Sequence, residues 1–360
     1  MINLHHIDCM EFMRGMADNS VDAIVTDPPY FGVKDEAWDN QWKDAAHFIE
    51  WIGELSEQWQ RILKPNGSLY CFASPQMGAR VEVKIGERFN VISSITWAKP
   101  EPTSEINRGA GNGGRVSKES LRSFYPNTER IVFAEHFGSD NIAKGEAGYE
   151  AKCDELRGFV FEPIRAYIAG EWERAGLTSR DANLATGSQM AGHYLTQTQW
   201  TLPTADKYRQ LQVYANRNGA EYLRTQYEEL RTQYEELRIQ YEGLRRPFNV
   251  TPEVPYTDVW TFKTVQAYDG KHVCEKPLAL MEHIILASTK PGAIVFDPFT
   301  GSGSTGVACV LNGRRFIGCE KDAHWHRYAA DRIMKHQAQP RLFDAPKLEK
   351  VTQTALYETP

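Results

Sequence analysis

One stretch sets the frame for the rest of this chain: Val21-Asp22-Ala23-Ile24-Val25-Thr26-Asp27-Pro28-Pro29-Tyr30. Residues 21–26 predict a short buried strand, so residues 27–30 fall at its carboxyl end, the edge where open α/β sheets bind ligands. Two consecutive prolines fix φ twice and remove two backbone N–H groups. A carboxylate, several carbonyl oxygens and an aromatic ring remain to face a ligand. These groups suit a flat base whose exocyclic amine donates to the oxygens while its ring stacks on the tyrosine.

Strands and helices alternate on both sides of this stretch, which predicts a parallel sheet covered by helices. The sequence predicts strands at residues 2–8, 68–72, 91–97 and 128–134, and two later strands that end at Asp297 and Glu320. The predicted helices cover residues 9–16, 44–63, 77–86, 276–286 and 307–311, with a turn at residues 65–67. Asp8 stands where the first strand ends, so it either shares a cleft with Asp27 or caps the helix that follows.

The composition is that of an ordinary globular protein with a substantial core. The 360 residues are 41% hydrophobic and 24% charged, with a formal net charge of −6, so any surface for nucleic acid must be local. Six cysteines are scattered without a C-x-x-C pair, which argues against a zinc site or disulfides and suits a reducing cytoplasm. We expect no metal, no signal peptide and no membrane partner.

The middle of the chain does not alternate strand and helix. Cations and a glycine-rich run share the loop at residues 99–130, which suits contact with a phosphate chain, although charged runs are usually solvated faces. Further on, two short helices about a glycine turn at Gly187 are compatible with a helix-turn-helix, whose second helix would cover residues 188–196. The residues predicted to contact DNA are Trp38, Lys99, Arg108, Arg115, Lys118, Arg122, Gln189 and His193.

Residues 223–243 contain a seven-residue repeat. Leu-Arg-Thr-Gln-Tyr-Glu-Glu at 223–229 recurs unchanged at 230–236 and with two changes at 237–243. Tyrosine and leucine alternate at spacings of three and four, which is the seam of a coiled coil. Three heptads are few for a strong independent coiled coil. We therefore predict a spacer or packing helix rather than a self-association helix.

A second constellation, Asp297-Pro298-Phe299-Thr300-Gly301-Ser302-Gly303-Ser304-Thr305-Gly306, follows a predicted strand and opens a helix. This is the context that G-x-G-x-x-G requires for close approach of a ligand to the backbone. Glu320 ends the next strand, where an acid can grip two ribose hydroxyls. A dinucleotide is one candidate, but Asp297 would repel a pyrophosphate and could hold an ammonium instead. S-adenosylmethionine offers an amino acid, a ribose and an adenine without phosphate, so we predict it as the cofactor.

The two motifs in this order resemble the amino-group DNA methyltransferases of the β arrangement, in which Asp-Pro-Pro-Tyr comes first and the glycine motif last. The resemblance covers about residues 1–135 and 256–335. It implies an α/β, Rossmann-like methyltransferase fold with a mostly parallel sheet, circularly permuted motif order and an inserted, mainly helical target-recognition region. The implied division is a catalytic half at 1–140, the insertion at 141–250, a cofactor half at 251–340 and a tail at 341–360.

The resemblance also implies roles for individual residues. The catalytic residues would be Asp27, Pro28, Pro29 and Tyr30. The residues that would hold the cofactor are Asp8, Lys276, Pro277, Asp297, Phe299, Gly301, Ser302, Gly303 and Glu320.

The implied reaction is methyl transfer to an amine of a base flipped out of double-stranded DNA. Asp rather than Ser at position 27 leans toward adenine N6, and cytosine N4 is the nearest alternative. RNA or protein-glutamine methyltransferases and a catalytically silent DNA-binding regulator are more distant alternatives, and a dehydrogenase would leave residues 27–30 without a role. A second copy of the chain and a cognate restriction enzyme are further candidate partners, although a phage or a solitary enzyme would show the same residues.

Overall fold

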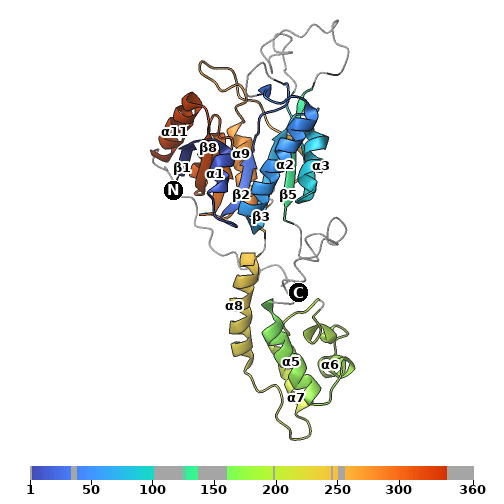
Figure 1. The fold of residues 1–360 in the computed structure, drawn as a ribbon. Coiled ribbons are helices and arrows are strands. Elements are labelled where there is room, and N and C mark those ends of the chain that lie inside the picture. The colour runs from blue at the N-terminus through green and yellow to red at the C-terminus, as the bar shows by residue number, and fades with distance from the viewer. Residues whose placement is uncertain are drawn as a thin grey trace.

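The computed structural model describes residues 2–33, 39–100, 124, 126–136, 160–197, 199–244, 246–249 and 256–338, with the side chains of 241–244 left out. Two parts are visible in Figure 1: a sheet with helices on both faces, and a smaller group of helices beyond one end of the strands. No helix within these ranges is both long and apolar enough to cross a membrane.

The sheet has eight strands in the order β1-β8-β7-β2-β3-β5-β4-β6. Neighbours run parallel from β1 to β3 and between β4 and β6, whereas β5 is antiparallel to both β3 and β4. The predicted α/β fold with a mostly parallel sheet is confirmed. The strands are β1 Ile2–His6, β2 Val21–Thr26, β3 Leu63–Ala73, β4 Asn90–Ala98, β5 Thr128–Glu135, β6 Val259–Thr261, β7 Ile294–Asp297 and β8 Arg315–Glu320.

Two hydrophobic cores lie on the two faces of this sheet. On one face, α1 (Cys9–Arg14), α2 (Ala45–Ile62) and α3 (Gly78–Gly86) bury side chains such as Trp59. On the other face, α9 (Leu278–Ser288), α10 (Ser304–Leu311) and α11 (Ala323–Ala338) bury side chains such as Ile284. A sheet covered on both faces keeps its ligand-binding edge at the ends of the strands.

One predicted turn is instead part of a strand. Residues 65–67 lie within β3, which begins at Leu63 directly after α2. The pairing with β2 slips in this segment, because Leu63 faces Val21 while Ser68 faces Ala23. A Cβ at Gly67 would lie 2.5 Å from the Leu63 side chain, so the irregular segment depends on glycine.

The smaller part is a helical unit between β5 and β6 in the chain. It consists of α5 (Glu162–Arg174), α6 (Ser179–Thr186), the 3-10 helix η6 (Ala191–Tyr194), α7 (Ala205–Ala215) and α8 (Tyr227–Leu244). These helices share a core of their own, which includes Ile168, Trp172, Tyr208 and Leu211.

The predicted helix-turn-helix is wrong. Its first helix exists as α6, followed by Gly187 at φ +63°. The second element is only the four-residue η6, too short to serve as a recognition helix. The Ser188 hydroxyl and the Asn183 amide oxygen accept the N–H groups of Met190 and Ala191, and such local side-chain bonds compete with helix formation.

The predicted packing role of the repeat helix is confirmed for the part whose side chains are described. Leu230 is 2% exposed and belongs to the core of the helical unit. The Tyr234 ring stacks on Phe161 with centroids 5.0 Å apart. Helix α8 begins only at Tyr227, so residues 223–226 of the first repeat are not helical.

Truncating the seam should therefore unfold the helical unit more easily. Leu230→Ala is expected to cost about 2–5 kcal/mol, because a fully packed leucine is lost. Ile239→Ala, on the same helix but 68% exposed, is the matched control and should change stability by no more than about 0.5 kcal/mol. Urea unfolding followed by circular dichroism measures both. Equal losses in the two variants would contradict this packing.

Candidate active site

The two sequence motifs meet at one edge of the sheet. Strand β2 lies beside β7 in parallel, with Ala23 opposite Val295, so Asp27 and Asp297 emerge next to each other. Strand β8 lies on the other side of β7 and brings Glu320 to the same edge. A cavity of about 650 Å³ opens there. Its lining includes the predicted residues Asp8, Asp27, Pro28, Pro29, Tyr30, Lys276, Asp297, Phe299, Gly301, Ser302 and Glu320.

The carboxylate of Asp27 is held on one side only. Its Oδ2 accepts a hydrogen bond from Lys276 Nζ at 2.5 Å. Its Oδ1 is buried and has no hydrogen-bond partner among the described residues. Because an unsatisfied buried acceptor is costly, such an atom in a cavity wall points to a site completed by a ligand. The Asp27 carboxylate therefore keeps unused capacity to accept an N–H group.

A buried charge network surrounds this carboxylate. Lys276 Nζ also lies 3.3 Å from Glu129 Oε2, and Lys99 Nζ lies 2.8 Å from Glu129 Oε1. Burial lowers the pKa of Lys276, but the charges of Asp27 and Glu129 outweigh it and raise this pKa overall. Burial raises the pKa of Glu129, but Lys276 and Lys99 outweigh it and lower this pKa to about 2. The Lys276 ammonium therefore lies beside an ionised Glu129 and in contact with the carboxyl group of Asp27.

Tyr30 is oriented by the same network. Its hydroxyl donates to Glu129 Oε2 at 2.9 Å, and its ring centroid lies 5.5 Å from Lys276 Nζ. Burial, together with the nearby Asp27 and Glu129 charges, raises the pKa of Tyr30, so the hydroxyl stays protonated. Glu129 was not among the predicted site residues. The signal that could have indicated it is an acid at the second position of β5, directly before the strand enters the core.

The glycine turn fixes the position of Asp297. Its Oδ2 accepts from the Thr305 hydroxyl at 2.6 Å and its Oδ1 from the Phe299 N–H at 3.1 Å. Gly303 has φ +81°, and a Cβ there would lie 3.1 Å from Ala329 Cβ on α11. The Gly301 N–H donates to Glu320 Oε2 at 2.8 Å, which ties the turn to the end of β8.

The acids of the cavity favour a cation over a phosphate. Burial, with a smaller contribution from the Asp27 and Glu320 charges, raises the pKa of Asp297 to about 7, although hydrogen bonds from Thr305 and Phe299 oppose the rise. Burial also raises the pKa of Glu320. Among the described residues, no group of three or more His, Cys, Asp and Glu is placed to hold a metal ion. An ammonium is the ligand group that would relieve this concentration of carboxyls.

Asp8 occupies both of the positions considered for it, at the cap of a helix and in the wall of the cavity. It caps α1 by accepting the Met10 N–H at 3.0 Å, and it also lines the cavity. Pro277 is the N-cap residue of α9, directly before the first helical residue Leu278. Two aromatic contacts of the cavity wall were not predicted, the pair His272 and Trp325 at 4.4 Å and the contact of Trp51 with Phe299 at 5.7 Å, and no local signal marks them.

The predicted DNA contacts are only partly described. Lys99, which was predicted to contact DNA, forms an ion pair with Glu129. Gln189 is exposed, and the His193 ring lies 3.3 Å from the Gln199 carbonyl oxygen. Trp38, Arg108, Arg115, Lys118 and Arg122 lie outside the described residues.

The raised pKa of Asp297 predicts a pH-dependent stability. The folded protein holds this proton up to about pH 7, whereas the unfolded chain loses it near pH 4. The carboxyl therefore stabilises the fold least once the pH has risen through 7. Without ligand, the free energy of unfolding of the wild type should fall between pH 5 and pH 8 relative to Asp297→Asn. Urea titrations at both pH values measure this, and parallel pH profiles would contradict the burial argument.

Comparison with known proteins agrees with this site. The family model of the N6/N4 DNA methylases matches residues 21–331. The chain is 25% identical over 348 residues to the Type II methyltransferase M2.DpnII of Streptococcus pneumoniae, covering 92% of this chain and 88% of that protein. It is 24% identical over 333 residues to the DNA adenine methyltransferase YhdJ of Escherichia coli, covering 91% and 81%.

A solved structure shares the fold. The PvuII DNA methyltransferase, which is cytosine-N4-specific, superposes with a TM-score of 0.50 at 12% identity, covering 95% of this chain and 88% of that chain. The family model spans most of the chain and both strand-end motifs. The chain therefore belongs to the N6/N4 DNA methylase family and is a DNA methyltransferase.

Proposed function

We propose that this enzyme transfers a methyl group from S-adenosylmethionine to the N6 amine of an adenine flipped out of double-stranded DNA, within a short specific sequence. The observation that carries the proposal is the Asp27 carboxylate, which lines the cavity and has unused acceptor capacity. Adenine is supported by aspartate at the first position of the tetrapeptide and by the similarity to an adenine methyltransferase.

S-adenosylmethionine is the cofactor, and the other half of the cavity has groups that fit it. Asp297 would hold the ammonium of the methionine end and Glu320 the ribose hydroxyls. Asp8 and Phe299 would flank the adenine, and the turn from Gly301 to Gly303 would let the molecule approach the backbone. When bound, the cofactor supplies an electrophilic methyl group on a sulfonium.

The residues of the other half would activate the target amine. This amine is a poor nucleophile because its lone pair is delocalised into the base. The Asp27 carboxylate and the Pro28 carbonyl oxygen would each accept a hydrogen bond from one of its two N–H groups. These hydrogen bonds raise the electron density on nitrogen and stabilise the positive charge that develops. Tyr30 would stack on the flipped base and align it, so that much of the acceleration comes from orientation.

Lys276 and Glu129 would position these groups. Burial raises the pKa of Asp27 overall, and the Lys276 ammonium opposes this rise and so favours the ionised carboxylate. Glu129 holds the hydroxyl of Tyr30 at 2.9 Å and so fixes the ring against which the base would lie. The resemblance places Lys276 beside the cofactor, and its contact with Asp27 adds a role beside the target base.

We further propose that the enzyme belongs to a restriction–modification system. The Type II names of the relatives support a restriction–modification system with a cognate restriction enzyme. We also propose the insertion at 141–250, which contains the helical unit, as the region of target recognition, because it lies between the two halves of the catalytic domain in the chain. A homodimer stays a prediction.

Removing the charge of Asp27 should abolish methyl transfer while leaving cofactor binding intact. Asp27→Asn keeps the shape and an acceptor oxygen but removes the negative charge that would stabilise the positive charge developing on the amine, so we expect a decrease of at least about 10²-fold in turnover. Transfer of a radiolabelled methyl group to DNA measures turnover, and calorimetry measures cofactor affinity. Asp18→Asn, at an exposed ion pair with Arg61, is the control. Full activity of Asp27→Asn would rule out the catalytic assignment.

The target base can be read directly. DNA from cells that express the wild type should contain N6-methyladenine in one recurring motif, detected by methylation-aware long-read sequencing, and DNA from cells with Asp27→Asn should not. N4-methylcytosine instead would keep the site and reject adenine. No modified base in either sample would overturn the proposal.

A further inference from the structure

Helix α8 repeats its surface as well as its seam. Arg231 pairs with Glu228 and Arg238 with Glu235, at 3.9 and 3.4 Å, each within the helix. Each of these ion pairs thus joins one repeat to the next. The helix carries five glutamates and two arginines, a charge unsuited to DNA phosphates. Its role is therefore structural rather than direct contact with DNA.

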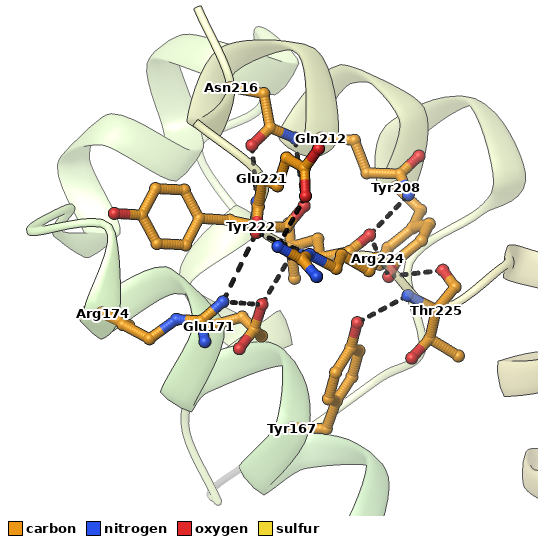
Figure 2. Close-up of polar contacts among 11 residues, drawn as sticks. Tyr167, Glu171, Arg174, Tyr208, Gln212, Asn216, Glu221, Tyr222, Arg224 and Thr225 are labelled. Atoms are coloured by element: carbon orange, nitrogen blue, oxygen red, sulfur yellow. Dashed lines mark hydrogen bonds and ion pairs between the residues drawn. The ribbon is translucent and has the colours of Figure 1, made fainter. Parts of the chain in front are cut away.

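The chain enters α8 through a firmly held loop, shown in Figure 2. The Asn216 side chain forms two hydrogen bonds with the backbone of Tyr222, at 3.0 and 2.6 Å. The Leu223 N–H donates to Glu171 Oε2 at 3.0 Å, and the Leu223 carbonyl accepts from Gln212 Nε2 at 2.7 Å. Leu223 is fully buried with φ +53°, a conformation that non-glycine residues rarely adopt.

Tertiary contacts, not local sequence, set where α8 begins. The Thr225 N–H donates to the Tyr167 hydroxyl at 2.8 Å, and the Thr225 carbonyl accepts from the Tyr208 hydroxyl at 3.0 Å (Figure 2). The same four residues, Leu-Arg-Thr-Gln, are helical at 230–233. The first copy of this tetrapeptide is thus an anchored loop, whereas the second copy is helix.

A second anchor follows the other end of α8. Arg246 Nε donates to Glu135 Oε2 at 2.7 Å, and the two side chains are 8% and 4% exposed. The Arg246 guanidinium also lies over the rings of Phe133 and Phe248, at 5.0 and 5.5 Å. Glu135 is the last residue of β5. Breaking a buried ion pair is strongly destabilising, so the chain after α8 is fixed to the sheet.

Between the two anchors, α8 packs on the core of the helical unit along one face. Tyr234 and Leu237 contact this core, whereas Ile239 on the outward face is 68% exposed. Figure 1 shows α8 running alongside α5 and up toward the lower end of the sheet. The helix therefore spans from one part of the molecule to the other.

We propose that α8 is a spacer whose number of heptads sets the distance between the helical unit and the catalytic sheet. One heptad lengthens an α-helix by about 10.5 Å and turns it by only about 20°, so the unit moves away without turning to another face. This step equals about three base pairs of DNA. The spacing would then select which bases the helical unit can reach while the target base occupies the cavity, a consequence that rests on the proposed function.

The repeats make this spacing adjustable without new packing. Deleting residues 230–236 leaves Leu223 in its anchor and brings Leu237 and Tyr241 onto the positions of Leu230 and Tyr234. Duplicating residues 230–236 likewise repeats existing residues. The chain before α5, residues 137–159, is long enough to follow a shift of this size.

The test compares the wild type, the deletion, the duplication and an insertion of four alanines after Ile239. Spin labels at Val213 and Val83, which are 68% and 71% exposed, report the distance between the two parts, with Cys153 and Cys274 replaced by serine. We expect the mean distance to shorten in the deletion and to lengthen in the duplication, by up to about 10 Å. Distances unchanged in both would overturn the spacer.

Methylation mapping tests whether the length of α8 also changes which DNA sequence is methylated. In the deletion and the duplication, cofactor affinity should stay within about twofold while the methylated motif changes. The four alanines turn the helix by about 40° and should weaken site-specific methylation. Shifted distances with an unchanged methylated motif would overturn the claim that the spacing selects the bases that the helical unit reaches. Shifted distances without methylation in any variant, the wild type included, would support the spacer and reject the proposed function.

Discussion

The catalytic edge depends on one buried ammonium shared by two carboxylates. Lys276 is 8% exposed and lies between Asp27, which directly follows β2, and Glu129 on β5. Removing one member of such a group would leave an uncompensated buried charge, which typically costs about 3–5 kcal/mol. The three residues come from three separate segments of the chain. Their contact therefore requires the sheet to be assembled correctly before the site can exist.

The sheet supplies the second constraint, because neighbouring parallel strands end together. The pairing of β2 with β7 brings the tetrapeptide beside the glycine turn, although about 270 residues separate the two in the chain. Acids then gather at one edge, and burial raises the pKa of Asp297 to about 7. The same crowding that makes this edge costly without a ligand makes it selective for an ammonium and an amine over a phosphate. The cost of burying these acids and the selectivity for a cationic ligand group thus have one physical origin.

The helical unit obeys a different rule. Its core is its own, and it is joined to the sheet by α8 and the buried pair of Arg246 with Glu135. Most of the hydrogen bonds at the start of α8 join side chains of α5 and α7 to backbone groups of one loop. A unit organised in this way can change its separation from the catalytic sheet while each part keeps its packing.

The sequence by itself determined the elements of the catalytic fold and both strand-end motifs, because alternation, glycine turns and a double proline are local signals. It also identified eleven of the residues that line the cavity, among them Asp8, Asp27, Asp297 and Glu320. It missed Glu129, since nothing near it in the chain shows that Tyr30 and Lys276 lie beside it. It mistook residues 188–196 for a helix, because Ser188 and Asn183 bind the amides that would begin one. The tetrapeptide Leu-Arg-Thr-Gln is a loop at 223–226 and a helix at 230–233, so only tertiary hydrogen bonds decide between the two.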